Sequence, residues 1–490
     1  MSRSVSRASL WLAAIQIGSE GMVLLRNVFL ARLLGPAEMG VVVTLAVTLR
    51  MLEMTTDLAV DRLMIQAKDG GQFRFQATAQ GFFLARGFVS GLVLSLLALP
   101  LAVMFDLRQS VWAFAALGLV PFVRGCAHLD YVRAQRDLSF RSTAVVEIVS
   151  NVVSTLACLP LALLVGDASA IVWVNLVRAV AIVLVSHWLA ERPYAIRLER
   201  ALVQRFSSFG WPLIVDGWVL FAMFHGDRIV IALTSTMEDL GRCGIVFQLS
   251  MVASLVLARS AISLWLPLLS RAQHQSEEFE QHYETGLKVL ACVSLAFIAG
   301  FMAAGNLVIE LLYGARYQVS PALVGWLAVM HGVRVVRTMP SIAAMARADS
   351  QTPMIGNLFR LSGVIGSVAA GAGGLGLEGI VAAGCAGEVV AGLASFALIQ
   401  RLHGLPLSRA WPPVAFVLAG SGVSAVLFLW LDLPWFAKWG AACLIELALV
   451  LAMWQELVNA GLARSPLFLK KRLSPVIDGA PPIVPRAEPT

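Results

Sequence analysis

Ionisable side chains lie deep inside apolar segments of this sequence, and they are the residues that could do chemistry. They are concentrated in four segments. The first contains Glu20 and Arg26, the second Arg50, Glu53 and Asp57, the third Asp216, His225, Asp227 and Arg228, and the fourth Arg259. No nucleophile elbow, Walker loop or H-E-x-x-H motif accompanies them, and no cysteine or histidine pair has metal-site spacing. The chemistry open to them is the binding of ions or polar head groups, and we predict no catalytic residue, metal or cofactor.

A charged side chain near the centre of a bilayer costs about 2.5–3.5 kcal/mol on insertion scales, so it should face a partner or a water-filled cavity. Arg50, Glu53 and Asp57 have the spacing i, i+3, i+7 and would share one face of a helix. Glu20 and Asn27 are also seven residues apart. One interpretation is an internal salt-bridge network that holds helices together. For the whole set we favour a water-filled cavity, because so many ions on four segments are difficult to pair completely.

Other charged residues in apolar segments are open to several interpretations. Asp227 lies near the end of its segment, where a charge at the membrane–water interface explains it at least as well as a functional role does. Arg334 and Arg337 are three residues apart and would either face the cavity or anchor the cytoplasmic end of their segment. Several more have no obvious partner, among them Arg86, Glu147, Arg178 and Glu388.

The composition indicates the surroundings of these residues. Of the 490 residues, 58% are apolar and 14% are charged, whereas a soluble globular chain carries about 25% charged residues. Apolar runs long enough to span a bilayer follow one another with short polar breaks. This pattern excludes a soluble enzyme. The net charge of +7 does not indicate nucleic-acid binding, because the sequence has no block of like charges and its basic residues flank the apolar runs.

Length and hydropathy predict an all-α polytopic membrane protein with about 14 transmembrane helices. We place the spans at residues 9–33, 39–60, 77–104, 110–132, 142–165, 168–190, 207–233, 242–269, 285–312, 320–345, 353–374, 377–400, 411–431 and 437–460. The breaks on the N-terminal side of the membrane contain about 21 lysines and arginines, and the opposite breaks contain about 5. This asymmetry predicts that both termini are cytoplasmic.

We expect four units along the chain. They are a six-helix lobe at 9–190, a second six-helix lobe at 207–400, two additional helices at 411–460 and a cytoplasmic tail at 461–490. The lobes are weakly similar, since Arg133-Ala134-Gln135 after the fourth span matches Arg347-Ala348-Asp349 after the tenth. An even number of spans gives both lobes the same topology, related by an axis along the membrane normal.

Four motifs, in this order and spacing, resemble one protein family over roughly residues 8–460. They are Asn27-Val-Phe-Leu-Ala-Arg-Leu-Leu-Gly-Pro-Ala-Glu-Met-Gly40, Tyr131-Val-Arg-Ala-Gln-Arg-Asp-Leu-Ser-Phe140, Phe209-Gly-Trp-Pro-Leu213 followed by Asp227-Arg228, and Leu311-Leu-Tyr-Gly-Ala-Arg-Tyr317. The set resembles bacterial polysaccharide exporters of the O-antigen flippase type, within the multidrug/oligosaccharidyl-lipid/polysaccharide exporter superfamily.

The resemblance implies two six-helix lobes in a V around a central cavity, with two further helices. Related lipid II flippases place arginines in this cavity from the first, second and eighth spans, and the matching positions here are Arg26, Arg50 and Arg259. Drug exporters of the superfamily usually have twelve spans and an acidic cavity. This chain offers arginines as prominently as acids, which favours an anionic substrate.

We therefore expect a non-enzymatic transporter that flips an undecaprenyl-diphosphate-linked oligosaccharide across the bacterial inner membrane for surface polysaccharide biosynthesis. Its expected partners are this lipid-linked substrate, membrane lipids and the polysaccharide polymerase machinery. The expected substrate-binding residues are Arg26, Arg50, Arg259, Glu20 and Asn27, and the expected cavity or ion-coupling acids are Glu53, Asp57, Asp216 and Asp227. Arginine can hold a diphosphate through paired hydrogen bonds. The alternatives are a cation-coupled multidrug or metabolite exporter on the same fold and, disfavoured by the short external breaks, a membrane glycan polymerase or ligase.

Overall fold

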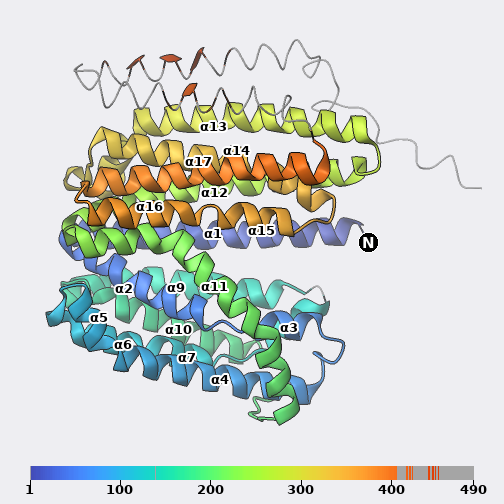
Figure 1. Ribbon diagram of the computed structural model, residues 1–490. Helices are drawn as coiled ribbons and strands as arrows, with labels where there is room; N and C mark the ends of the chain where they lie inside the picture. The colour runs from blue at the N-terminus through green and yellow to red at the C-terminus, as the bar shows by residue number, and fades with distance from the viewer. Residues whose placement is uncertain are drawn as a thin grey trace, which may run out of the picture.

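The computed structural model describes residues 2–137, residues 139–405 and scattered positions between 415 and 451, and for residues 2–17 it describes the backbone alone (Figure 1). Within these residues the chain is helical and contains no strand. This confirms the predicted all-α class. The predicted spans at 411–431 and 437–460 and the tail at 461–490 lie outside the described residues, apart from those scattered positions.

The first part of the chain, called the N half below, contains a run of long helices with several breaks. Its α-helices are α1 (Ser2–Leu33), α2 (Pro36–Thr55), α3 (Val60–Gln66), α4 (Phe73–Leu96), α5 (Ala98–Met104), α6 (Val111–Leu117), α7 (Leu119–Gly125), α8 (Asp130–Ala134), α9 (Arg141–Val165) and α10 (Ala170–Trp188). Two short 3₁₀ turns, η1 (Arg108–Ser110) and η2 (Gln135–Asp137), join them. The breaks have local causes, since Ala59 and Asp106 adopt positive φ angles of 47° and 54°.

The second part, called the C half, consists of longer helices. They are α11 (Arg200–Thr234), α12 (Met237–Ala272), α13 (Ser276–Tyr313), α14 (Pro321–Ala346), α15 (Gln351–Leu358), α16 (Leu361–Ala372) and α17 (Gly376–His403), with the 3₁₀ turn η3 (Ala315–Tyr317). Side chains cap two of them, because Thr236 accepts from the Asp239 amide and Ser320 accepts from the Leu323 amide.

Every predicted span before residue 400 coincides with a helix or a broken helix. In the described part of the chain, eight helical segments are long and apolar enough to cross a membrane, or up to ten if each bent pair counts as one span. One of these pairs is α2 with α3, which meet at a bend of 43°. The structure therefore confirms a polytopic membrane protein, and the count of about 14 spans stays a prediction.

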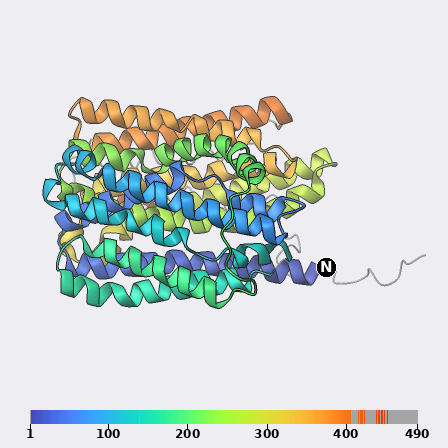
Figure 2. The same cartoon turned by 90° about the horizontal axis from the view of Figure 1, so that it is seen from below.

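The helices lie in two groups that run roughly side by side (Figure 1). Helices α2 to α10 form one group, and α12 to α17 form the other, with α11 leading from the first to the second. Helix α1 packs along α9, as the view from below also shows (Figure 2). The two groups meet mainly where α2 packs on α12 and α11.

Two glycines allow α2 and α12 to approach closely. A Cβ atom on Gly40 would lie 1.9 Å from the carbonyl oxygen of Met237, and one on Gly241 would lie 1.9 Å from that of Pro36. No other residue type fits at either position without moving the backbone. Both glycines open their helices at the end predicted to be external, so the two halves are held together at that end.

Candidate functional site

A cavity of about 460 Å³ lies between the two halves. Its walls come from α2, α3, α4, α7, α8, η2, α9 and α10 of the N half and from α11 of the C half. The volume is in the range of pockets that bind small molecules. The charged residues that line it are the carboxylates Glu53, Asp57, Asp61, Glu147 and Asp216 and the arginines Arg50, Arg62, Arg86 and Arg124.

Glu53 on α2 is the carboxylate with the most partners in this cavity. One of its oxygens lies 2.7 Å from Nη1 of Arg124 on α7, and the other lies 3.1 Å from Nη1 of Arg50 one helical turn away. Sequence reasoning missed Arg124. The available signal was an arginine inside an apolar segment, the same one that identified Arg26 and Arg50.

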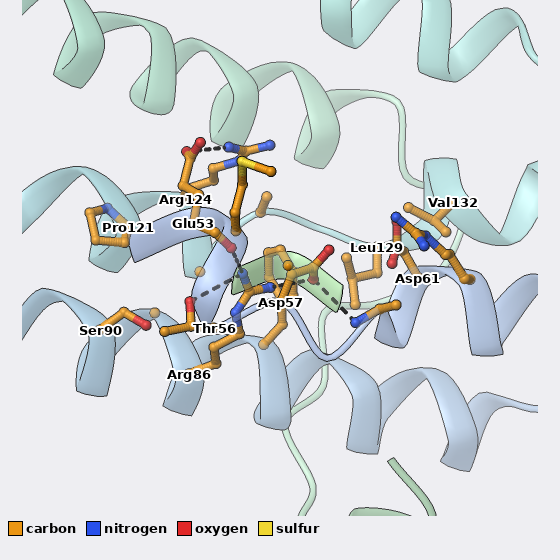
Figure 3. A pocket seen from close by; sticks show the side chains of 18 of the residues that line it. Glu53, Thr56, Asp57, Asp61, Arg86, Ser90, Pro121, Arg124, Leu129 and Val132 are labelled. Atoms are coloured by element: carbon orange, nitrogen blue, oxygen red, sulfur yellow. Dashed lines mark hydrogen bonds and ion pairs between the residues drawn. The ribbon is translucent and has the colours of Figure 1, made fainter. Parts of the chain in front are cut away.

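Asp57 lies in the break that follows α2, beside Arg86 and Thr56 (Figure 3). Its Oδ1 is 3.1 Å from Nη1 of Arg86 and also accepts a hydrogen bond from the Ala59 amide. The prediction that Asp57 shares a helix face with Arg50 and Glu53 is wrong, because α2 ends at Thr55. The break nevertheless keeps its carboxylate in the cavity lining.

Charged residues predicted to have no obvious partner are in fact paired. Arg86 on α4 binds Asp57, and its Nη2 also donates to the Glu53 carbonyl oxygen at 3.2 Å. Arg178 on α10 lies 3.2 Å from Glu147 on α9. Each of these pairs joins two different elements of the N half. The salt-bridge network and the cavity therefore coexist, whereas the sequence analysis treated them as alternatives.

Arg26 on α1 differs from the other arginines in this region. It is only 7% exposed, and its Nε has no hydrogen-bond partner. Arg178 and Arg50 lie close enough to act on it electrostatically. The Nε of Arg178 is likewise buried without a partner. Arg26 and Arg178 thus each have a buried Nε–H group without a partner among the described residues.

The structure brings four of the predicted site residues into the cavity lining, namely Arg50, Glu53, Asp57 and Asp216. The other five lie elsewhere. Glu20 is half-buried on α1, Asn27 donates to the Gln248 side chain of α12, Arg259 is half-buried on α12 and Asp227 is half-buried on α11, while Arg26 lies within electrostatic reach of Arg50.

The end of the molecule predicted to be external is closed by hydrogen bonds between the halves. Arg32 donates to the carbonyl oxygens of Leu311 and Leu312, and Arg316 donates to those of Ala31 and Arg32. These contacts, which we call the external clasp, lie at the same end as Gly40. The cavity instead extends toward α3 and η2, on the side whose breaks are rich in basic residues.

Comparison with known proteins gives consistent matches. A family model described as "Polysaccharide biosynthesis protein" matches residues 29–321. The succinoglycan biosynthesis transport protein ExoT of Rhizobium meliloti (strain 1021) is 22% identical over 339 residues, which cover 68% of this chain and 67% of that protein.

Two solved structures share the fold. The lipid II flippase MurJ, in an inward closed conformation, aligns with a TM-score of 0.68 at 13% identity over 92% of this chain and 99% of that one. A multidrug resistance MATE family transporter of the MOP superfamily, facing inward, aligns with a TM-score of 0.63 at 15% identity over 81% of this chain and 98% of that one. At these identities the likeness establishes the fold and leaves the substrate open.

Proposed function

This chain belongs to the polysaccharide biosynthesis protein family and has the fold of MOP-superfamily transporters, and on that premise we propose that it flips an undecaprenyl-diphosphate-linked oligosaccharide across the inner membrane. The family match and the shared fold confirm the resemblance seen in the sequence. It is a multi-pass bacterial membrane protein whose known relatives are transporters and flippases. The cytoplasmic position of both termini and the polymerase partner stay predictions.

The observation that carries the proposal is the guanidinium group of Arg26, which forms no ion pair with any residue that the structure describes. A charged group in the apolar part of a membrane protein needs a partner or water. Glu53, Asp57 and Glu147 are already bound to Arg50, Arg124, Arg86 and Arg178, and among the described residues neither Asp61 nor Asp216 forms an ion pair with Arg26. An anion brought by the substrate would supply the missing partner, and a diphosphate suits arginine donors best.

The remaining lining residues suit a sugar. Carboxylates accept hydrogen bonds from hydroxyl groups, and Asp216 on α11 faces the cavity without an ion pair among the described residues. Glu53 and Asp57 hold Arg50 and Arg86 in place. Asn27 and Glu20 on α1, and Arg259 and Asp227 in the C half, stay proposed contacts that a change of conformation would bring to the cavity.

Alternating access explains the closed external end. In the proposed cycle the head group enters the cavity from the cytoplasmic side while the polyprenyl tail stays in lipid. The external clasp then opens and the cavity closes on the other side, as the two halves rock against each other. An ion gradient or the membrane potential, which supplies about 2.3 kcal/mol per charge per 100 mV, would drive the cycle.

The test uses a strain that lacks the gene and carries variants at normal expression. Arg26→Gln, Arg50→Gln and Arg259→Gln should each reduce surface polysaccharide and leave the lipid-linked oligosaccharide in the cytoplasmic leaflet. Arg271→Gln, at the exposed end of α12, is the matched control and should leave both unchanged. Full surface polymer in all three of these arginine variants would remove the proposed role.

One observation favours a second candidate, a cation-coupled exporter. The carboxylates that line the cavity outnumber the arginines by one, and Asp216 is the carboxylate on the C-half wall. Under this alternative Asp216→Asn would abolish extrusion of an organic cation and leave surface polysaccharide intact. Under the proposed function the same variant lowers surface polysaccharide.

A further inference from the structure

A second group of charged residues lies inside the C half, away from the cavity. Glu388 on α17 has no exposed surface and contacts three arginines. Its oxygens lie 3.0 Å from Nη2 of Arg334, 2.9 Å from Nε of Arg337 and 2.8 Å from Nε of Arg360. We call these four residues the Glu388 cluster. Glu388 has no obvious partner in the sequence, and in the structure its partners come from α14 and from the break before α16.

The cluster is not electrically balanced. One carboxylate surrounded by three guanidinium groups leaves an excess of two positive charges. Asp227 and Arg228 on α11 act on the cluster electrostatically, and their opposite charges leave the excess unchanged. In the part of the chain that the structure describes, no second carboxylate forms an ion pair with these three arginines. A buried charge without compensation is costly, so an excess of this kind calls for an anion.

Several N–H groups of these arginines also have no hydrogen-bond partner among the described residues. Nη1 of Arg337 donates a hydrogen bond to the Asn357 side chain at 2.8 Å. Among the described residues, Nη1 of Arg334 and both terminal nitrogens of Arg360 have no hydrogen-bond partner. The Nε of Arg228, which also interacts electrostatically with Arg334, is buried and unpartnered. Unused N–H groups of several arginines therefore lie in one region of the C half.

This region borders the central cavity. Leu220 of α11 lines the cavity, and Phe224 lies one helical turn further along the same helix, a rise of about 5.4–6 Å. The guanidinium carbon of Arg360 is 5.0 Å from the centroid of the Phe224 ring. The residue that contacts Arg360 is therefore one helical turn from a residue of the cavity wall.

We propose that the Glu388 cluster is a second anion site, which binds a phosphate-type oxyanion through Arg334 and Arg360. Glu388 holds the three arginines in place and, as a like charge to the ligand, keeps the affinity low enough for release. The oxyanion is either a free inorganic ion or the diphosphate of a lipid. The site does not depend on the substrate proposed above, because its geometry comes from the C half alone.

In the test, the purified full-length chain in detergent is titrated with inorganic pyrophosphate, and its thermal unfolding midpoint is measured at each concentration. Sodium gluconate at matched ionic strength is the control for general salt effects. All variants carry Arg26→Gln, which removes binding by the unpaired arginine of the N half. In this background pyrophosphate should still raise the midpoint in a saturable way.

Three substitutions then separate an anion site from a purely structural cluster. Arg334→Gln and Arg360→Gln should each weaken the apparent affinity for pyrophosphate about tenfold or more, because each removes a charge-assisted donor. Glu388→Gln should strengthen it by a similar factor, because it removes a repelling charge and keeps the side-chain shape. A gain in affinity cannot result from damage to the fold, so Glu388→Gln decides the question even if the arginine variants fold poorly.

Two results would overturn the proposal. In the first, Arg26→Gln alone abolishes every effect of pyrophosphate. In the second, all three cluster variants lower the midpoint equally at every pyrophosphate concentration. If the site exists, competition by farnesyl diphosphate at the concentration of half-saturation identifies a lipid head group as the ligand, and lack of competition identifies a free inorganic ion. Surface polysaccharide measured in cells tests the transport function separately.

Discussion

Glu53 of α2 and Arg124 of α7 form the shortest ion pair among those described in the cavity, at 2.7 Å between Oε1 and Nη1. The pair is 71 residues apart in sequence and joins the helix that contacts the C half to the outer wall of the N half. Because Glu53 also binds Arg50, its removal would leave two arginines without a partner.

The Glu53–Arg124 pair should therefore show strong energetic coupling. In a double-mutant cycle of Glu53→Gln and Arg124→Gln, we expect an interaction free energy of unfolding of about 0.5–3 kcal/mol. The control is the exposed pair Glu238–Arg242, one turn apart on α12, for which we expect less than about 0.5 kcal/mol. Equal coupling in the two cycles would contradict the view that the lower exposure of the carboxylate, 21% for Glu53 against 50% for Glu238, strengthens the cavity pair.

Gly40 should tolerate no side chain. Gly40→Ala puts a methyl group against the Met237 carbonyl oxygen, and we expect a loss of about 1–3 kcal/mol in the free energy of unfolding. Gly300→Ala on α13 is the matched control, because nothing lies within 4 Å of the added atom there. We expect this change to be neutral or stabilising by up to about 1 kcal/mol. Thermal unfolding of both proteins in detergent measures the difference.

The external clasp should control exposure of the cavity to the outside. Arg316→Gln removes the donor to the carbonyl oxygens of Ala31 and Arg32, so the closed arrangement becomes less favourable. We expect a severalfold faster reaction of a cysteine placed at Leu34 with a membrane-impermeant maleimide added to cells. Tyr317→Phe, which loses one hydrogen bond to the Leu34 carbonyl oxygen, should give a smaller increase.

The matched control for the clasp is Arg108→Gln, an exposed arginine at the same predicted end of the molecule. It should leave the labelling rate unchanged. Unchanged labelling in Arg316→Gln as well would show that these hydrogen bonds do not hold the external end closed.

Asp349, in the break between α14 and α15, should make stability depend on pH. Hydrogen bonds from Thr352, and then from His403, hold the pKa of this carboxyl well below its usual range. A lowered folded-state pKa adds stability above the unfolded pKa of about 3.9, and this stability is lost as the pH falls through the folded value.

Asp349→Asn should therefore destabilise the protein at neutral pH, by about 0.5–2 kcal/mol, since the carboxylate also accepts the first amides of α15. The difference between the two proteins should shrink as the pH is lowered below about 4. Chemical unfolding of both proteins at several pH values measures it. A constant difference from pH 7 down to acid conditions would show that the carboxylate's charge is not the cause.

Hydropathy was sufficient to predict an all-α polytopic membrane protein, because a membrane-crossing helix is predominantly apolar along its length. The two-lobe fold was implied by the family resemblance. Hydropathy also identified Arg26, Arg50 and Glu53, since an ion in an apolar segment is rare. It could not place Asp57, because the end of α2 depends on the left-handed backbone at Ala59 rather than on the polarity of neighbouring residues.

The partners of buried charges were also beyond sequence reasoning. Arg86 and Asp57 are 29 residues apart, and Glu388 draws its arginines from α14 and from the break before α16. Such contacts depend on how each helix is rotated about its own axis. Periodicity gives the polar face of one helix, but it does not say which face of which neighbour lies opposite.

The acceptors of the external clasp are main-chain carbonyl oxygens, and a main-chain oxygen neither takes up a proton in the biological pH range nor disappears when a side chain is exchanged. If this end faces the outside of the cell, as predicted, changes in the external pH therefore do not weaken the hydrogen bonds of the external clasp. Evolution can likewise vary the acceptor residues freely, provided that the two donor arginines and the course of the backbone are retained.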